Sequence, residues 1–486
     1  MNRQTFLKTL GCVLASSVLQ SCSPEKAPPK RPNILFLFTD DQRFDTIRAL
    51  GNKHIMTPSL DSLVINGTTF TNAYIMGGTS PAVCAPSRAM LLTGRTLFKV
   101  DKQGLWQYDI MPENPTLPET FRKAGYTTFG TGKWHNGQAS YSRSFSAGDT
   151  IFFGGMSDHF RVPWCDFDPL GNYPAGDDLK DLRKKTASGE KGKHSSELFS
   201  DSAINFLRNY QSDKPFFMYI SYTAPHDPRE MPEEFRDMYD TDTIPLPANF
   251  LPEHPFDNGE LKIRDELLEA FPRTPDKIRR HIADYYAMIT HLDSQIGRVL
   301  KTLEDTGYAE NTIIVFAGDN GLAVGQHGLL GKQNVYEYSV HVPLILSGPG
   351  IPAGEKRDAF VYLQDIFPTL CNLTGIPVPT TVEGIDLVPA LCDENEKIRD
   401  TLSFAYMDYQ RAVRDERYKL IEYAVNGKRT TQLFDLKNDP WETHNLAGDP
   451  AFSEHQNRLR KELIQWRDRL GDTSPFWEAM GSTFSH

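Results

Sequence analysis

The sequence has few cysteines, fewer positive than negative charges and no long apolar run. Of its six cysteines in 486 residues, three belong to a leader and a motif described below. The other three give no basis for a disulfide framework: Cys165, Cys371 and Cys392. The formal net charge of -11 argues against nucleic acid or an anionic membrane surface as a partner, because both repel an acidic protein. An anionic substrate would therefore have to meet a locally basic pocket.

The composition that remains is typical of a large soluble globular protein. The chain is 39% hydrophobic and 24% charged, and its 486 residues exceed the size at which one hydrophobic core stops growing, about 250–300 residues. We expect a larger domain over residues 32–395 and a smaller one over residues 396–486.

The first residues carry the pattern of a secretory signal. Arg3 and Lys8 precede an apolar run over residues 10–19, which is too short to span a bilayer. Residues 19–22, Leu-Gln-Ser-Cys, resemble a bacterial lipoprotein box, although glutamine is an unusual occupant of its position, and this would make Cys22 the lipid-bearing N-terminus. Ordinary signal cleavage nearby is the alternative. Either way, we expect a signal peptide at 1–21, a tether at 22–31 and an extracytoplasmic protein, in the periplasm or at the cell surface, that meets the membrane only through a lipid anchor.

Short apolar runs, each followed by polar residues, predict buried strands at 33–38, 127–129, 216–220 and 312–316. The polar residues that follow them are Asp40, Asp41, Lys133, His135, His226, Asp319 and Asn320. In open α/β sheets, ligands bind at the carboxyl ends of the strands. These polar residues are therefore candidates for one shared site, although each pair alone would suit a solvated turn.

One helix is clear from its apolar periodicity, over residues 275–303, where apolar residues recur at spacings of three and four. Such a stripe covers a sheet, so His281 and His291 on this helix receive no catalytic role. Strands alternating with helices predict an α/β fold with a doubly wound, largely parallel sheet.

The stretch that begins at Cys84 contains the most informative motif of the sequence. Pro86 suits the first turn of a helix and Gly94 can end it, so Cys84 is expected at a helix N-terminus, which attracts anions. With Arg88 one turn further on, the residue types alone indicate a thiolate nucleophile of lowered pKa. A buried structural cysteine is the alternative.

The motif Cys-x-Pro-Ser-Arg at residues 84–88, followed by Leu-x-Thr-Gly-Arg at residues 91–95, resembles the signature of the type I sulfatases. In that family a maturation enzyme oxidises the cysteine to formylglycine. A hydrated aldehyde carries two hydroxyls on one carbon: one attacks sulfur to give a covalent sulfo-enzyme, and the other then expels sulfate. The resemblance therefore implies that Cys84 is modified to formylglycine by a formylglycine-generating enzyme.

The same resemblance continues in order through the polar strand ends, through Gly331-Lys332, and through residues 433–446 near the C-terminus. It implies an alkaline-phosphatase-like fold, in which helices sandwich a large, mostly parallel sheet. From residue 401 onward, short segments with a hairpin turn at Asp415-Glu416 and a break at Asp439-Pro440 predict a small antiparallel sheet, followed by a helix from about residue 452 to 470.

The resemblance also implies a role for each site residue. One calcium ion would be held by Asp40, Asp41, Asp319, Asn320 and residue 84, and hard oxygen ligands do favour calcium or magnesium over zinc. The catalytic set would be Cys84, Arg88, Lys133, His135, His226 and Lys332. In it, Arg88 and Lys133 stabilise developing negative charge, and Lys332 reaches a sulfate oxygen or the bridging oxygen. His226 with Lys332 protonates the leaving sugar oxygen, His135 takes the proton when sulfate is expelled, and Asp319 removes the first proton from the attacking hydroxyl.

Two histidines stand outside this set. Relatives commonly carry arginine in place of His341, which we interpret as a local difference in packing or ion pairing. His327 is either a substrate contact or part of a structural loop.

A secreted sulfatase with long insertions at residues 138–196 and 229–272 is expected to remove O-sulfate from a carbohydrate, such as glycosaminoglycan or mucin. We expect these two segments to recognise the sugar. The acidic sequence shows no evident cationic surface for the interior of a polyanion, so we expect the enzyme to act on chain ends. Lysines and arginines over residues 180–193 are either a solvated face or contacts to acidic glycan groups. Three tryptophans could stack on sugars, although core packing is the commoner fate: Trp106, Trp134 and Trp164.

Other activities stay open. A sulfamidase acting on N-sulfoglucosamine and a phosphate or phosphonate monoester hydrolase belong to the same superfamily. A catalytically inactive glycan-binding lipoprotein would not need the cysteine, both histidines and both lysines intact.

Overall fold

The computed structural model describes residues 31–102, 110–174 and 192–481. The chain divides into two units, Met1–Arg31 and Pro32–His486, and the fold below belongs to the second. The predicted signal peptide, nearly all of the tether, Trp106 and most of the basic residues over 180–193 fall outside the described residues. Within the described part of the chain, no helix has the length and apolar character needed to cross a membrane.

An eight-stranded sheet forms the centre of this unit, in the order β10-β2-β9-β8-β1-β7-β5-β6. All neighbours pair in parallel except β9, which runs antiparallel to both β2 and β8. The strands are β1 (Asn33–Thr39), β2 (Gly67–Phe70), β5 (Thr127–Lys133), β6 (Ala147–Phe152), β7 (Phe216–Ser221), β8 (Thr312–Gly318), β9 (Leu344–Ser347) and β10 (Glu355–Arg357). The predicted α/β fold with a largely parallel sheet is confirmed.

The four apolar runs singled out in the sequence form the adjacent strands β8, β1, β7 and β5. Leu37 in the middle of β1 pairs with Ile220 on β7 and with Phe316 on β8. All residues of β1 are buried, as expected for a strand covered on both faces. Because parallel strands end at the same edge of the sheet, the polar residues that follow them converge there.

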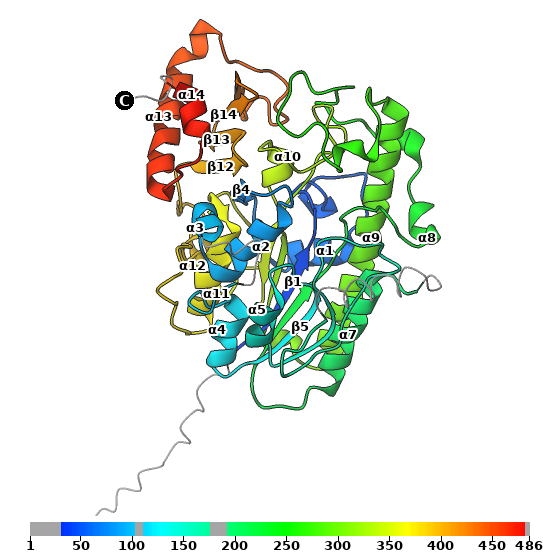
Figure 1. Cartoon of the computed structure of the whole chain (residues 1–486). Helices are drawn as coiled ribbons and strands as arrows, with labels where there is room; N and C mark the ends of the chain where they lie inside the picture. Colours follow the sequence, from blue (N-terminus) through cyan, green and yellow to red (C-terminus); the bar gives the residue numbers. More distant parts are fainter. Residues whose placement is uncertain (1–30, 103–109, 175–191, 482–486) are drawn as a thin grey trace, which may run out of the picture. The chain divides into compact units, whose positions relative to one another are not determined.

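Helices cover both faces of this sheet (Figure 1). Leu35 and Leu37 point into one hydrophobic cluster, shared with α1 (Pro58–Ile65), α7 (Ser195–Asn209) and α9 (Pro275–Asp305). Phe36 and Phe38 point into the other, shared with α2 (Cys84–Thr93), α4 (Leu117–Lys123), α5 (Gln138–Ser144) and α11 (Ile366–Leu373). The long helix predicted from residue 275 is α9, whose first residue is a proline, as helix starts favour.

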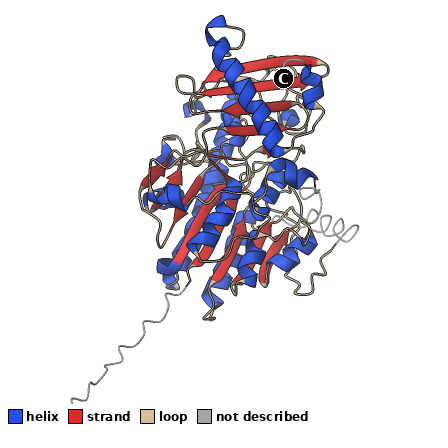
Figure 2. Cartoon of the chain, turned by 90° about the vertical axis from the view of Figure 1, so that its left-hand side faces the viewer, coloured by secondary structure: helices blue, strands red, loops and turns tan. Residues whose placement is uncertain are grey.

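A smaller five-stranded sheet lies near the C-terminus, with helix α13 (Ser453–Leu470) packed along it (Figure 2). Its strands β12 (Leu402–Tyr406), β13 (Gln410–Arg414), β14 (Tyr418–Val425) and β15 (Lys428–Asp435) are antiparallel, and Asp415 and Glu416 lie in the turn between β13 and β14. The predicted small antiparallel sheet and its helix are confirmed. The fifth strand, β4 (Gly77–Gly78), comes from far earlier in the chain and pairs in parallel with β12. The proposed domain boundary at residues 395 and 396 stays a prediction.

The remaining elements are short. The strands β3 (Ala73–Tyr74) and β11 (Val361–Tyr362) pair with each other, and the helices are α3 (Leu97–Lys102), α8 (Glu233–Arg236), α10 (Glu337–Val340), α12 (Val388–Cys392) and α14 (Phe476–Met480). Short 3-10 helices are η1 (Arg48–Leu50), η2 (Thr241–Thr243), η3 (Glu266–Leu268), η4 (Ala309–Asn311), η5 (Leu363–Asp365) and η6 (Pro450–Phe452). The four described cysteines are all free, so no disulfide joins these described elements.

Candidate active site

The acidic residues predicted at two strand ends meet at the carboxyl edge of the large sheet. Asp40 and Asp41 follow β1, while Asp319 and Asn320 follow β8. The backbone nitrogen of Asp41 donates to Asp319 Oδ1 at 3.0 Å, and Asn320 Nδ2 donates to Asp41 Oδ1 at 2.7 Å. All four side chains are buried. Residues almost 280 positions apart in the chain thus form one cluster because their strands are neighbours.

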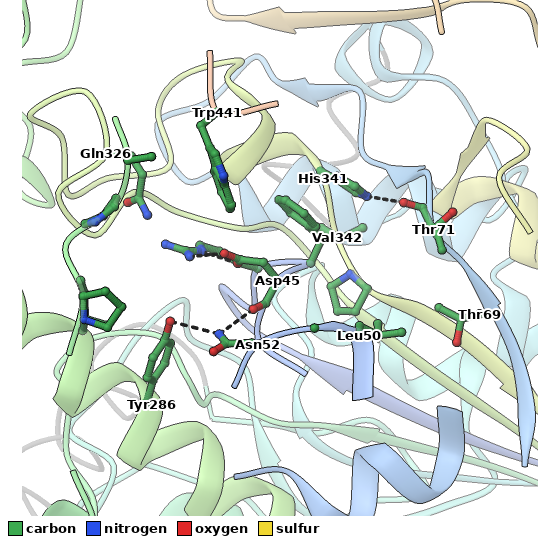
Figure 3. Close-up of a pocket in the computed structure, with 18 of the residues that line it drawn as sticks. Asp45, Leu50, Asn52, Thr69, Thr71, Tyr286, Gln326, His341, Val342 and Trp441 are labelled. Atoms are coloured by element: carbon green, nitrogen blue, oxygen red, sulfur yellow. Dashed lines mark hydrogen bonds and ion pairs between the residues drawn. The ribbon is translucent and has the colours of Figure 1, made fainter. Parts of the chain in front are cut away.

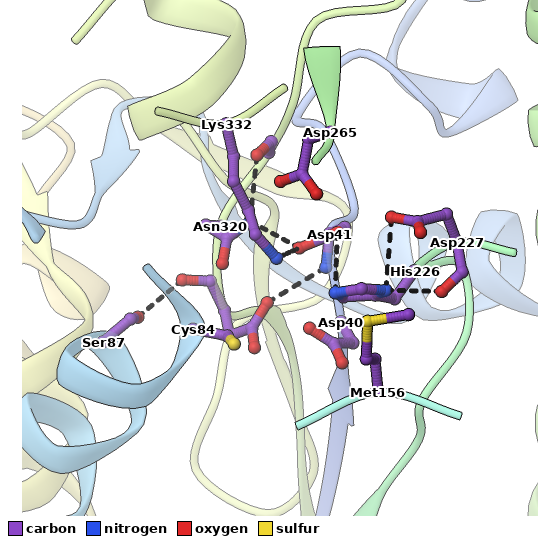
Figure 4. A network of polar contacts seen from close by, with 12 residues as sticks. Asp40, Asp41, Cys84, Ser87, Met156, His226, Asp227, Asp265, Asn320 and Lys332 are labelled. Atoms are coloured by element: carbon purple, nitrogen blue, oxygen red, sulfur yellow. Dashed lines mark hydrogen bonds and ion pairs between the residues drawn. The ribbon is translucent and has the colours of Figure 1, made fainter. Parts of the chain in front are cut away.

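Cys84 lies at the N-terminus of α2 and faces this cluster (Figure 4). The helix ends at Gly94, as predicted, and this glycine takes a left-handed conformation. Cys84 Sγ lies 3.4 Å from Lys133 Nζ and 3.4 Å from His135 Nδ1. Burial raises the pKa of this thiol, even though Lys133 and Lys332 act to lower it. The interpretation of an unmodified Cys84 as a thiolate of lowered pKa is therefore wrong, because desolvation outweighs the neighbouring cations.

Arg88, one turn further along α2, is fully buried among acceptors. It contacts Asp319 Oδ2 through Nε at 2.9 Å and also donates to Ser221 Oγ at 2.5 Å. Ser87 Oγ donates to the backbone oxygen of Asp319 at 2.5 Å. Helix α2 is thus fixed to the end of β8 by two consecutive side chains, which sets the position of Cys84.

Two lysines bring further positive charge to the carboxylates. Lys133 Nζ lies 2.6 Å from Asp40 Oδ2, and Lys332 Nζ lies 2.6 Å from Asp41 Oδ1. Burial opposes the ionisation of Asp40, but Lys133, His226 and Arg88 hold its pKa well below the usual range. The pKa of Asp319, in contrast, is raised by burial and by the neighbouring Asp40. Three carboxylates, Asp40, Asp41 and Asp319, thus lie among three cations, Arg88, Lys133 and Lys332. Pairing of this kind offsets part of the cost of removing the charges from water.

His226 approaches Asp41 from a different side than Lys332 does (Figure 4). Its Nδ1 lies 2.7 Å from the backbone oxygen of Asp227. A carbonyl oxygen only accepts, so Nδ1 carries a hydrogen and Nε2 is the nitrogen that faces the cluster, 3.7 Å from Asp41 Oδ2. His135 lies beside Cys84, and burial, assisted by Lys133 and Arg88, lowers its pKa well below the ordinary value.

The acidic cluster fits an oxygen-liganded cation. Asp40 Oδ1 and Asn320 Oδ1 are buried and have no hydrogen-bond partner among the described residues. Ligand atoms of Asp40, Cys84 and Asp319 lie within 4.8 Å of one another, as do those of Asp40, Asp41 and His226. Orphaned carboxylate and amide oxygens are the ligands that calcium and magnesium prefer. The residues present therefore fit one such ion.

Several residues that lie beside the site were not singled out from the sequence. Arg264 forms a bidentate ion pair with Asp227, at 2.8 and 3.1 Å, and also pairs with Asp265. It contacts Met156 Sδ as well, so the two insertions predicted to read the substrate meet beside His226. Gln333 Nε2 donates to Asp265 Oδ2 at 2.6 Å. The Pro-His motif could have pointed to Asp227, but no local pattern distinguishes the others from surface charges.

Other residues discussed in the sequence have structural positions. Trp134 is 1% exposed and donates to Ser140, so it belongs to the core, whereas Trp164 is 37% exposed. His327 is buried, and its Nε2 donates to the backbone oxygen of Glu442, which makes it part of a structural loop. His341 stacks between Phe44 and Tyr74, and its Nδ1 lies 3.7 Å from Glu337 Oε2, so it has a structural position in the fold.

The family models and relatives that this chain matches are those of sulfatases. Residues 32–376 match the Sulfatase family, and residues 325–469 match the family described as N-sulphoglucosamine sulphohydrolase, C-terminal. The chain is 28% identical to an N-acetylglucosamine-6-O-sulfatase of Bacteroides thetaiotaomicron, over 96% of this chain and 92% of that protein. It is 30% identical to an arylsulfatase of Clostridium perfringens, over 90% of this chain and 94% of that protein.

Among solved structures, the protein BT4656 in complex with its substrate D-glucosamine-2-N,6-O-disulfate is similar, with a TM-score of 0.73 and 26% identity, covering 92% of this chain and 99% of that one. The expected alkaline-phosphatase-like fold is confirmed by such neighbours. The family match spans most of the chain and includes every residue assigned above to the site, and from it we conclude that this protein belongs to the sulfatase family and is a sulfuric ester hydrolase.

Proposed function

We propose that this sulfatase removes O-sulfate from the end of a sulfated carbohydrate, with residue 84 acting as formylglycine. The observation that carries the proposal is the position of Cys84. It lies at the N-terminus of a buried helix, between Lys133 and His135, beside three carboxylates and three cations. The carbohydrate part rests on relatives that are described as acting on sulfated sugars.

As formylglycine, residue 84 would supply the hydroxyl that attacks sulfur and a second hydroxyl that allows sulfate to leave, and a calcium ion, when bound, would supply positive charge beside the sulfate. Asp40, Asp41, Asp319 and Asn320 would hold that ion.

The other side chains position the sulfate and move protons. Arg88, Lys133 and Lys332 are fixed by carboxylates, so they stabilise negative charge without reorganising. His226 presents Nε2 to the site, 3.7 Å from Asp41 Oδ2, where a proton can pass to the leaving sugar oxygen. His135 stays neutral near pH 7 because its pKa is lowered, so it can accept the proton released when sulfate is expelled.

Modification of Cys84 is tested by intact mass and by substitution. We expect purified active protein to lack the mass of an unmodified thiol at residue 84, and Cys84→Ala to lose turnover while keeping its fold. Cys84→Ser retains a hydroxyl but cannot expel sulfate, so it should accumulate a stable sulfate ester. Active enzyme with an alkylatable thiol at residue 84 would disprove the proposal.

The calcium proposal has its own measurement. Chelation should abolish sulfate release, and calcium added back should restore it, while elemental analysis of active protein should give one calcium per chain. Stoichiometric zinc would contradict an oxygen-liganded site.

The substrate is tested with defined saccharides. We expect sulfate release from N-acetylglucosamine-6-O-sulfate at the end of an oligosaccharide, and slower release from the interior of intact polymers. The match of residues 325–469 to an N-sulphoglucosamine sulphohydrolase segment supports N-sulfate as the second candidate. Release from N-sulfoglucosamine but not from the 6-O-sulfate would select that candidate, and rapid internal release would disprove action at chain ends.

We further propose that a formylglycine-generating enzyme matures the chain and that Cys22 carries a lipid anchor outside the cytoplasm. Cys22→Ser should release the protein from the membrane fraction. An unchanged membrane fraction would contradict the anchor.

A further inference from the structure

A cavity with its own set of lining residues is present in the described part of the chain (Figure 3). Its volume is about 560 Å³, which falls within the range of small-molecule sites, roughly 300–1,000 Å³. Residues 43–52, the end of β2, residues 245–248, α9 and Trp441 enclose it. None of the proposed catalytic or metal-binding side chains lines this cavity.

One side of the cavity is built from flat rings. Phe44 stacks on His341 with ring centres 3.9 Å apart and an angle of 7° between the planes. Trp441 continues this surface, 6.3 Å from Phe44 at 29°. His341 Nε2 donates to the backbone oxygen of Thr71 at 2.8 Å, and burial lowers the pKa of His341 to about 4, so this ring is uncharged near neutral pH. The wall is therefore an apolar, aromatic platform.

Two of the three charged side chains that line the cavity pair with each other. Arg43 binds Asp45 through two contacts, at 2.8 and 2.5 Å, and both side chains are largely buried. Figure 3 shows Trp441 and Tyr286 on opposite sides of this ion pair. Lys356 is the third charged side chain; it is exposed, and its ammonium group can donate hydrogen bonds to a ligand.

A few polar atoms remain available to a ligand. Gln326 Oε1 accepts from the backbone of Val324, but among the described residues nothing accepts from its Nε2. Tyr286 accepts from Asn52 at 3.1 Å, which leaves its hydroxyl hydrogen free to donate. Thr69 is 1% exposed and its hydroxyl has no partner within the described chain.

We propose that this cavity is an accessory carbohydrate-binding site, which takes an uncharged pyranose ring against Phe44 and Trp441. A pyranose ring has apolar C–H faces and a rim of hydroxyls, which matches an aromatic platform beside separate hydrogen-bonding groups and a neutralised Arg43–Asp45 ion pair. The choice of a glycan rests on the proposed function. Such a site would hold the protein on a glycan independently of the sulfate being removed.

The site is tested with methyl β-N-acetylglucosaminide, which has no sulfate for the catalytic centre to recognise. Binding is measured by ligand-observed NMR on full-length Cys84→Ala protein. In this background, Trp441→Ala should weaken binding by at least about tenfold, because it removes half of the platform. Ala248→Trp should block binding by filling the cavity from an exposed position, without removing any packing.

Trp164→Ala, at an exposed tryptophan outside the cavity, is the matched control and should bind the sugar normally. Loss of binding in this control but not in Trp441→Ala or Ala248→Trp would overturn the inference. The absence of sugar binding to the Cys84→Ala protein would also overturn it. So would a result in which indole binds in place of the sugar and is lost in both Trp441→Ala and Ala248→Trp. Sulfate release is measured separately, so failure of the proposed function would show there and not in this titration.

Discussion

At the scale of single residues, the site depends on buried charges that stabilise one another. Lys332 is 4% exposed and contacts Asp41, and although burial opposes its charge, Asp41 raises its pKa well above the ordinary value. Lys332 therefore stays charged near neutral pH. A fixed, desolvated cation of this kind stabilises developing negative charge more strongly than one in water.

Lys332→Ala should reduce kcat/KM for an aryl sulfate by about 100-fold to 1,000-fold, the usual cost of one preorganised electrostatic contact. Lys123→Ala, at a lysine whose side chain is 68% exposed, is the control and should change nothing. Circular dichroism would verify that both variants are folded. Wild-type kcat/KM in Lys332→Ala would remove this residue from the catalytic set.

At the scale of elements, helix α2 is held at both ends. Its N-terminal half is fixed to Asp319 through Ser87 and Arg88, and its last residue is followed by Gly94 at φ +66. A Cβ at Gly94 would lie 2.7 Å from Val382 Cγ1. The helix that carries Cys84 therefore ends against a neighbouring loop that leaves no room for a side chain.

Gly94→Ala should lower the free energy of unfolding by about 2–4 kcal/mol, the sum of left-handed strain and overpacking. Gly125→Ala is the matched control: Gly125 also has a positive φ, but a Cβ there meets nothing within 4 Å. It should cost only the strain, about 1–2 kcal/mol. Equal losses in urea titrations of the two variants would show that the contact with Val382 has no effect.

At the scale of the whole molecule, several histidines are buried in the neutral form. Burial lowers the pKa values of His159, His254, His291 and His327 to about 4. The unfolded chain binds protons at these histidines near pH 6.5, whereas the folded chain does not. The stability they contribute is therefore complete above pH 6.5 and is lost progressively as the pH falls toward 4.

His254→Gln should flatten this pH dependence. A pKa lowered from 6.5 to about 4 corresponds to about 3 kcal/mol of stability lost by pH 4 for one histidine. The measurement is the free energy of unfolding between pH 4 and 7, and His444→Gln, at an exposed histidine, is the control. An unchanged slope in His254→Gln would show that this histidine does not contribute.

Much of the architecture could be predicted from local patterns. The strands β1, β5, β7 and β8 are continuous apolar runs, and α9 has an apolar stripe, because burial on two faces or on one imposes those patterns on consecutive residues. Antiparallel β9 was not predicted, nor was the pairing of β4 with β12, because strand order depends on contacts between distant segments.

The sequence by itself determined the central strands, the long helix, the position of Cys84 at a helix start and the candidate site residues, since each depends on neighbours a few positions away. Only the tertiary structure decided that Arg264 and Met156 meet beside His226, that His341 completes an aromatic wall, and that the Cys84 thiol has a raised pKa. Those properties depend on which side chains surround a group in space and on how much water they exclude, and no local pattern encodes either.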